Sequence, residues 1–250
     1  MIIQDHDCQS SSRQLDSGRQ PSPQRRRPSL ALGDTRVRSI VSHVPPAGAH
    51  AAKPAASDWQ KGLPILRGPG VTLRQIEPQD ATALFDALAP QDVEAAFEPA
   101  PTSAEMFGQY ISWARKQITT GRAACFAIVP DGSLHAVGVV QLRRLDSQFK
   151  TADWGIVLAP AWRGTGLFVD VAQTLLRFAF ETVGVHRLEA RTGGTNLPAC
   201  AAMRKIGAKL EACLPKSFLC GGRYLDDELW VIADRDWQEI RAALALAKTT

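Results

Sequence analysis

Residues 155–181 read GIVLAPAWRGTGLFVDVAQTLLRFAFE, and this stretch predicts a buried strand, a glycine loop and a long helix. The strand is the apolar run 156–158, and apolar residues at helical spacing indicate a helix that continues to about residue 183. In the loop, Gly164 and Gly166 permit backbone conformations that a Cβ would forbid. The first N–H groups of a helix have no partners within it, and the helix dipole is positive there. We therefore expect a cradle for an anion such as a pyrophosphate, with Arg163 as an added cation.

A short glycine motif also occurs in ordinary tight strand-to-helix connections, so the loop alone is equally compatible with a structural role. It is not a Walker A loop, because the ending G-K-S/T is missing. It is not a dinucleotide fingerprint either, since Val169 stands where that motif has its third glycine.

With its flanks, the stretch resembles the acetyl-CoA-binding motif of the GNAT superfamily of N-acetyltransferases, R/Q-x-x-G-x-G/A, aligned at residues 163–168. Phe168 stands where that family usually has Gly or Ala. Downstream, NLPACAAMRKIGA at 196–208 resembles the family's next motif, in which Asn196 and Gly207 match and Ala199 replaces a Ser. The likeness runs from about residue 71 to 236 and is greatest to the ribosomal-protein N-terminal acetyltransferase subfamily.

The resemblance implies an enzyme that transfers an acetyl group from acetyl-CoA to a primary amine, by direct attack in a ternary complex and without a metal. A backbone amide around Val157 would stabilise the oxyanion, as the family's fourth strand usually does. Asn196 would touch the pantetheine arm. The implied acetyl-CoA contacts are Ile156, Val157, Leu158, Arg163, Gly164, Thr165, Gly166, Leu167, Phe168 and Asn196.

The acid and base of the reaction are less evident. The family's usual acid is a Tyr seven residues after the motif Asn, and this chain has Met203 there. Tyr224, on the last predicted hairpin, is a poor substitute by alignment. For the base we favour Asp153, just before the cofactor strand, with Glu189 and Asp226 as rivals. Each of the three could instead be a structural carboxylate.

Residues 89–101 align with the segment that lines the acceptor side in the family, and here they include Asp92, Glu94 and Glu98 but no Lys or Arg. Such a rim would attract a cationic amine, although a solvated acidic loop is an equal alternative. An α-amine with a pKa of about 7.7–8.0 is partly neutral near pH 7, whereas a lysine amine at about 10.4 is hardly so. We therefore expect the acceptor to be a peptide or protein N-terminus, or a small molecule with a comparably weak base.

Composition separates the chain into two regions. Residues 1–64 are rich in Ser, Gln, Pro, Arg and Ala, which predicts a disordered leader before a domain at 65–250. A basic arm that touches RNA and an organelle transit peptide are alternatives for the leader. The net charge of +4 makes nucleic acid an unlikely partner. No apolar run is long enough for a membrane span, and the start does not read as a secretory signal.

The five cysteines are odd in number and lack C-x-x-C spacing, which indicates reduced thiols in a cytoplasmic protein. Cys200 is interpreted as a buried thiol because no His lies nearby in sequence. We expect a monomer or a homodimer. A catalytically weak CoA-binding module that acts through a partner remains the alternative function.

The order of predicted elements favours an α/β fold of mixed α+β character, with about seven strands in a mixed, mostly antiparallel sheet and helices on both faces. The strands are expected at residues 71–76, 123–129, 135–145, 151–158, 186–192, 209–219 and 224–233. Thr102-x-x-Glu105 predicts a capping box at the start of the second helix, and Thr195 or Asn196 is expected to cap the helix that follows the fifth strand.

Overall fold

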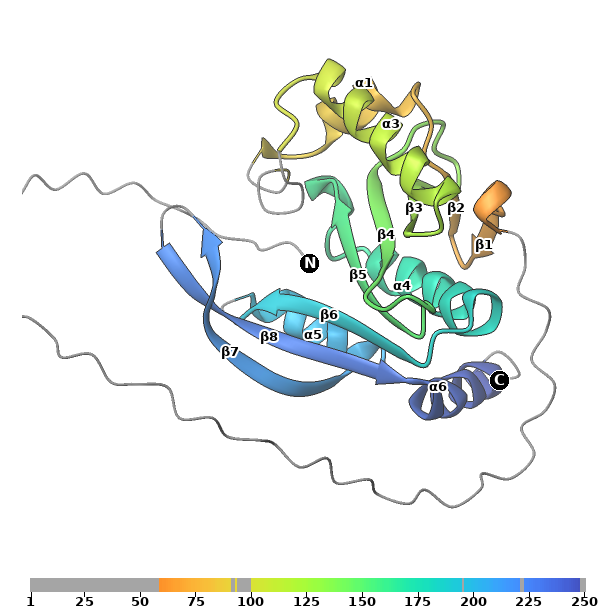
Figure 1. The fold of residues 1–250 in the computed structure, drawn as a ribbon, viewed down its shortest axis with the longest axis vertical. Helices are drawn as coiled ribbons and strands as arrows, with labels where there is room; N and C mark the ends of the chain where they lie inside the picture. Colours follow the sequence, from red (N-terminus) through yellow and green to blue (C-terminus); the bar gives the residue numbers. More distant parts are fainter. Residues whose placement is uncertain (1–58, 91–92, 94–99, 195, 221–222, 248–250) are drawn as a thin grey trace, which may run out of the picture. The chain divides into compact units, whose positions relative to one another are not determined.

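The computed structural model describes residues 59–90, 93, 100–194, 196–220 and 223–247, which build one eight-stranded sheet with helices packed on it (Figure 1). The strands are β1 (Leu66–Gly68), β2 (Val71–Gln75), β3 (Ala123–Pro130), β4 (Gly138–Arg144), β5 (Thr151–Leu158), β6 (Arg187–Gly193), β7 (Lys209–Cys220) and β8 (Arg223–Ala233). Their order in the sheet is β1-β2-β3-β4-β5-β6-β8-β7. Only β5 and β6 are parallel neighbours, so the expected mixed, mostly antiparallel sheet is confirmed. The strand beyond the expected seven is β1, which at three residues is too short to show a period in the sequence.

The helices follow the predicted segments closely. They are α1 (Asp80–Ala87), α3 (Ala104–Thr119), α4 (Leu167–Arg177), α5 (Leu197–Lys205) and α6 (Asp234–Ala247), with a π-helical turn η3 (Phe178–Val183) that continues α4. Gly184, with φ of +77°, ends this run in the left-handed conformation. Two 3₁₀ turns, η1 (Trp59–Lys61) and η2 (Pro160–Trp162), also lie in the described part of the chain.

One predicted cap is wrong by a residue. Ser103, rather than Thr102, is the N-cap of α3, and its hydroxyl accepts the N–H of Met106 at 3.2 Å. Ser103 has the extended backbone that an N-cap needs, whereas the Thr102 hydroxyl donates to the sulfur of Met106.

Contacts from two successive residues of β3 place α4 and α3 on opposite faces of the sheet. Phe126 of β3 packs edge-on against Phe178 of η3 at 5.3 Å, so one face carries α4 and η3; we call it the α4 face. Cys125, the next residue, points the other way and lies 3.6 Å from the hydroxyl of Tyr110 on α3. This opposite side is the α1/α3 face. Helices on both faces are therefore confirmed.

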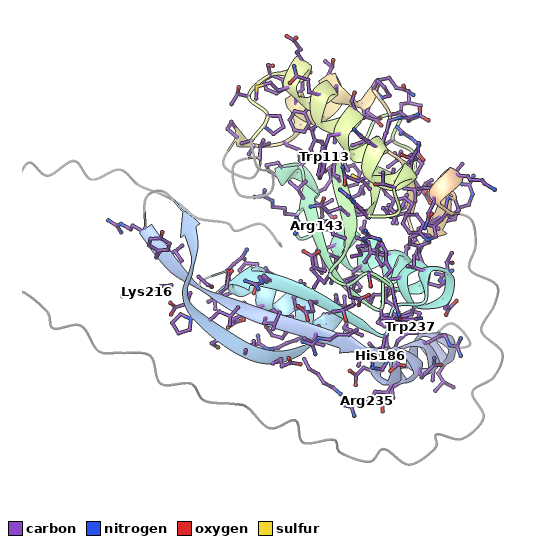
Figure 2. The ribbon with its side chains drawn as sticks, in the orientation of Figure 1. Trp113, Arg143, His186, Lys216, Arg235 and Trp237 are labelled. Carbon is purple, nitrogen blue, oxygen red and sulfur yellow. The ribbon has the colours of Figure 1, made fainter. Side chains whose placement is uncertain are left out.

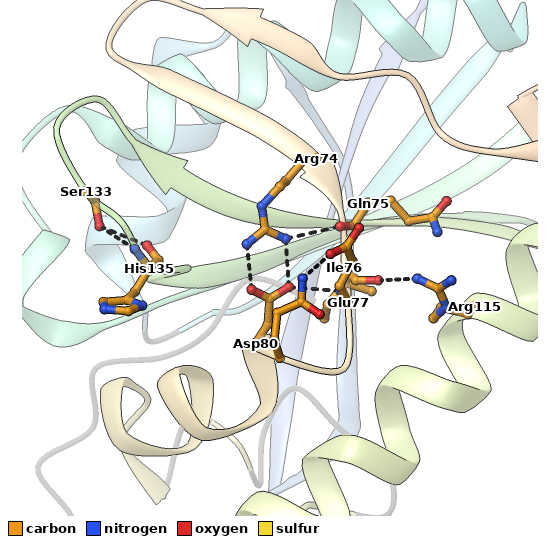
Figure 3. Close-up of polar contacts among 9 residues, drawn as sticks. Arg74, Gln75, Ile76, Glu77, Asp80, Arg115, Ser133 and His135 are labelled. Atoms are coloured by element: carbon orange, nitrogen blue, oxygen red, sulfur yellow. Dashed lines mark hydrogen bonds and ion pairs between the residues drawn. The ribbon is translucent and has the colours of Figure 1, made fainter.

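Polar contacts fix α1 and α3 to the strand end beneath them (Figure 3). Arg74 of β2 holds Asp80 at the start of α1 through two bonds of 2.8 and 2.6 Å. The same carboxylate accepts the N–H of Glu77 at 2.9 Å, which closes the turn between strand and helix. Arg115 of α3 reaches the carbonyl of Ile76 at 3.4 Å. Both helices are thus tied to one corner of the sheet.

The packed domain includes residues that precede the expected boundary at 65. Trp59 is 7% exposed and packs edge-on against Phe149 at 5.6 Å and Phe178 at 6.3 Å between ring centroids. The composition of the flanking residues hid this anchor, because one aromatic residue does not make a periodic pattern. No helix among the residues that the structure describes is long and apolar enough to cross a membrane.

Candidate active site

The parallel strands β5 and β6 separate after a short contact, and this leaves half of β5 without a neighbour. They pair only where Thr151–Asp153 face Arg187–Glu189. Beyond that point the two strands diverge toward their C-terminal ends (Figure 1). Residues 154–158 of β5 therefore keep one row of backbone N–H and C=O groups that β6 does not take. We call this row the open edge.

The hydrogen-bond phase of β5 decides which residues point to the open edge. Thr151 accepts the N–H of Leu145 at 2.8 Å, and Ala159 donates to Val137 at 2.8 Å. In an antiparallel strand these directions alternate, so odd-numbered residues of β5, Val157 included, turn their backbone toward β4. The groups of Ile156 and Leu158 face the open edge. In this register the N–H of Val157 points to β4 and those of its two neighbours point to the open edge, and an oxyanion donor around Val157 stays a prediction.

The glycine loop has the geometry expected of an anion cradle. Gly164 has φ of +73°, and Gly166, the N-cap of α4, has φ of +93°. A Cβ built at either residue meets no heavy atom within 4 Å, so the need for glycine is conformational. Thr165 braces the loop by donating to the carbonyl of Trp162 at 2.8 Å. In the described part of the chain, no backbone acceptor takes the N–H of Gly164, Gly166 or Phe168, so these donors remain for a ligand.

Phe168 is compatible with this cradle although the related motif has Gly or Ala there. Its ring is partly buried and packs on Trp154 of β5, with 6.1 Å between centroids and 36° between planes. The side chain therefore lies against the sheet while its N–H stays at the start of α4. Arg163, at the loop entrance, donates to the carbonyl of Leu158 at 3.5 Å. This contact brings the cation beside the open edge.

Asn196 is the N-cap of α5, three residues after β6 ends at Gly193. It is 2% exposed, and its Oδ1 accepts the N–H of Ala199 at 3.0 Å, so Asn196 is the N-cap. The structure thus gives this residue a capping role, one of the two alternatives expected. A contact of Asn196 with a pantetheine arm stays a prediction.

Each of the three carboxylates considered as a base has a structural partner. Asp153 receives two bonds from Arg143 of β4, at 3.2 and 2.5 Å; Figure 2 labels this arginine. Glu189 accepts from Arg187 at 2.7 Å. Asp226 is exposed and accepts the N–H of Lys216 at 2.8 Å. These pairings favour the structural alternative for all three.

The region around α5 supplies no acid that the family would use. Met203, in the usual Tyr position, is 1% exposed. Cys200 is buried, its Sγ donates to Glu228 at 3.1 Å, and burial together with that carboxylate raises the pKa of the thiol. A protonated, buried thiol agrees with the interpretation from sequence. Tyr224 is 64% exposed on the β7–β8 hairpin.

Two further predictions concern the acceptor side and metals. Asp92, Glu94 and Glu98 lie outside the described residues. Within the described ranges, no group of three or more His, Cys, Asp and Glu side chains could hold a metal ion.

Sequence reasoning missed Asp227, a carboxylate on β8 that is 5% exposed. Burial raises the pKa of Asp227, against the opposing effect of Arg191 on β6. Its side chain shares a face with Leu225 and Leu229, because alternate residues of a strand point the same way. The available signal in the sequence was an acidic residue between two apolar residues at alternate positions. The strand register is needed to show which face of the sheet carries these side chains.

Three known proteins illustrate what this chain is similar to. It is 24% identical over 174 residues, 67% of this chain and 93% of the other, to the "Putative ribosomal N-acetyltransferase YdaF" of Bacillus subtilis. It is 24% identical over 99 residues to a spermidine N(1)-acetyltransferase of Vibrio cholerae, covering 40% of this chain and 57% of that protein. The solved structure of RimL, a ribosomal L7/L12 alpha-N-protein acetyltransferase in complex with coenzyme A, superposes with a TM-score of 0.62 at 18% identity. That superposition covers 68% of this chain and 98% of RimL.

A family model extends the likeness over most of the described domain. The model of the acetyltransferase (GNAT) domain matches residues 71–209, a range that holds the open edge, the glycine loop and α5. The resemblance noted from the two motifs is thereby confirmed. Because the match covers more than half of the chain, this protein belongs to the GNAT acetyltransferase family, whose co-substrate is acetyl-CoA.

Proposed function

We propose that the protein is a cytoplasmic N-acetyltransferase whose acceptor is the α-amine of a peptide or protein N-terminus, or a small molecule with a comparably weakly basic amine. Acetyl transfer needs a neutral amine, a stabilised oxyanion and a leaving thiolate. Positioning both substrates can supply much of the rate.

The described residues can meet the first demands of this reaction. The N–H groups at the start of α4 and the nearby Arg163 would hold the pyrophosphate of acetyl-CoA. The open edge would bind the pantetheine arm, and the N–H of Ile156 or Leu158 would hydrogen-bond the thioester oxygen as negative charge develops. With Met203 in place of the usual acid, the thiolate would leave with a proton from water.

Charge pairing on the α1/α3 face is the observation that carries the choice of acceptor. Asp153 is paired with Arg143, and Glu189 shares Arg187 with Glu211, so both candidate carboxylates already have a cationic partner. A polyamine needs several uncompensated carboxylates spaced along its length. A single ammonium group, as at a peptide N-terminus, needs only one. The pairing therefore favours an acceptor with one positive charge.

The basicity of the amine points the same way. No described carboxylate among the three first candidates is free to act as a strong base. An α-amine, with a pKa of about 7.7–8.0, needs less help to become neutral than a lysine amine at about 10.4. By sequence, the putative ribosomal N-acetyltransferase YdaF aligns over 93% of its length and the spermidine N(1)-acetyltransferase over 57% of its length.

The test is acetylation of matched peptides by the full-length protein with acetyl-CoA. One peptide has a free N-terminus and an internal lysine, its twin has a blocked N-terminus, and spermidine serves as a polyamine competitor. We expect product on the N-terminal amine of the free peptide, located by fragment mass spectrometry. Product on lysine alone, equal rates for both peptides, or a clear preference for spermidine would each contradict the proposal.

A further inference from the structure

Asp227 lies on the sheet face and at the strand level where an acceptor amine would approach the thioester. Its cross-strand partner is Gly193, the last residue of β6. Asp153 and Glu189 pair across β5 and β6, and Glu189 shares its face with Gly193 and therefore with Asp227. All of these residues thus belong to the α1/α3 face. This face is opposite the one that carries α4, and the anion cradle lies at the start of α4.

Gly193 of β6 lies between Asp227 and the edge of β6 that is no longer paired with β5. Neighbouring strands are about 5 Å apart, so the carboxylate stands one strand spacing from that side. Gly193 has no side chain that could screen it. A larger residue at 193 would place its own side chain between Asp227 and an amine at the open edge.

The charge of Asp227 is offset only from a distance, by positive charges such as Arg191. In the part of the chain that the structure describes, Asp227 takes part in no ion pair within 4 Å. From β6, Arg191 acts on it at longer range, and on β7 the Ser217 hydroxyl donates to the carbonyl of Leu214 at 2.9 Å. Its neighbours along the same face of β8, Leu225 and Leu229, are apolar. This setting differs from the paired carboxylates Asp153 and Glu189.

We propose that Asp227 is the catalytic base, and that it first binds the acceptor as an ammonium ion. The carboxylate takes one proton from the ammonium group, and the neutral amine nitrogen then attacks the thioester carbon. The C–N bond forms and the C–S bond breaks, the attacking nitrogen loses its second proton to water, the thiolate of CoA takes a proton from water, and Asp227 returns its proton to solvent. Burial that raises the pKa of Asp227 moves the carboxylate toward the range in which a base works well.

The inference rests on acetyl transfer to an amine and holds for either acceptor class. The experiment compares the full-length wild type with Asp227→Asn, Asp227→Glu and the matched control Asp226→Asn. The neighbour Asp226 is exposed and holds the N–H of Lys216, a bond that an Asn oxygen can keep. Thermal melts and CoA titrations check that each variant is folded and binds the cofactor.

We expect Asp227→Asn to lower kcat/KM about 100-fold or more, the range usual for loss of a general base. The wild-type fall in kcat/KM at acid pH should vanish in this variant, because protonation of Asp227 causes it. Asp227→Glu should restore part of the rate, and Asp226→Asn should change it less than threefold. An unchanged acid limb in Asp227→Asn, or equal losses in Asp227→Asn and Asp226→Asn, would overturn the assignment.

The assay runs with the free peptide and with spermidine, so failure of the acceptor proposal is separable from failure of this one. Preference for spermidine would reject the peptide acceptor while the Asp227 comparison proceeds on spermidine. Should wild type turn over neither, titration of both amines into the CoA complex decides. Equal amine affinity of wild type and Asp227→Asn in that titration would also overturn the proposal.

Discussion

In the glycine loop, glycine is needed because of the backbone conformation and not because a larger side chain would clash. Gly166 has a positive φ, yet nothing stands within 4 Å of a Cβ built there. An alanine would fit the empty space but not the backbone. The loop also presents donors to a ligand, so a change in conformation at Gly166 should affect binding as well as stability. A glycine with equal strain and no ligand provides the contrast.

Gly132, in the turn after β3, is that contrast, with φ of +81° and open space at its Cβ position. We expect Gly166→Ala and Gly132→Ala each to lower the free energy of unfolding by about 1–2 kcal/mol, the cost of left-handed backbone for an L-residue. Only Gly166→Ala should also weaken CoA binding, by tenfold or more in calorimetry. Equal CoA affinity in the two variants would show that the loop is merely a connection.

At the scale of elements, the sequence predicted which segments form strands and helices. It did not predict in which direction the backbone groups of a strand point or which residues face each other across strands. The β5 strand was expected at the residues where it occurs, since its apolar run and flanking turns are local signals. The direction of the Val157 amide was not predictable, because it depends on pairing with β4. The Arg143 partner of Asp153 was hidden for the same reason: the two face each other only in this register. Burial at Asp227 likewise comes from neighbours distant in sequence.

The β4–β5 turn sets this register through one side chain, and its stability should depend on acidity. The carboxylate of Asp146 accepts the N–H of Gln148 at 2.8 Å and Lys150 at 3.0 Å, and also that of Thr151. These bonds, with that of Lys150 the largest, hold the pKa of Asp146 below its usual value, so the stabilisation is present above the ordinary aspartate range. It is lost as pH falls through the lowered pKa.

We therefore expect Asp146→Asn to lower the melting temperature at pH 7 and to flatten its decline at acid pH. Asp131→Asn, in the β3–β4 turn, is the control, since the described contacts show no hydrogen bond to that carboxylate. Identical melting curves for wild type and Asp146→Asn from pH 7 to strongly acidic conditions would mean that the turn is held by other means.

At the scale of the whole molecule, composition predicted a domain that begins at residue 65, and the packed residues include the earlier Trp59. Composition reports where apolar residues are frequent, whereas one buried ring can fasten a segment that is otherwise polar. Trp59 does this from a 3₁₀ turn. Its ring packs against Phe178 of η3 and against Phe149, which lies shortly before β5. The start of the packed domain therefore depends on the Trp59 side chain.

Two truncations test where the domain begins. We expect a protein that starts at residue 59 to keep the melting temperature and CoA affinity of the full chain, because the composition of residues 1–58 gives little apolar surface to bury. A protein that starts at residue 65 loses Trp59 and should be less stable by about 3–5 kcal/mol, the usual cost of removing a buried Trp. Trp59→Ala in the full chain is the matched control and should reproduce most of that loss. A drop in melting temperature for the longer protein, equal to that of the shorter one, would instead assign the stabilisation to residues before 59.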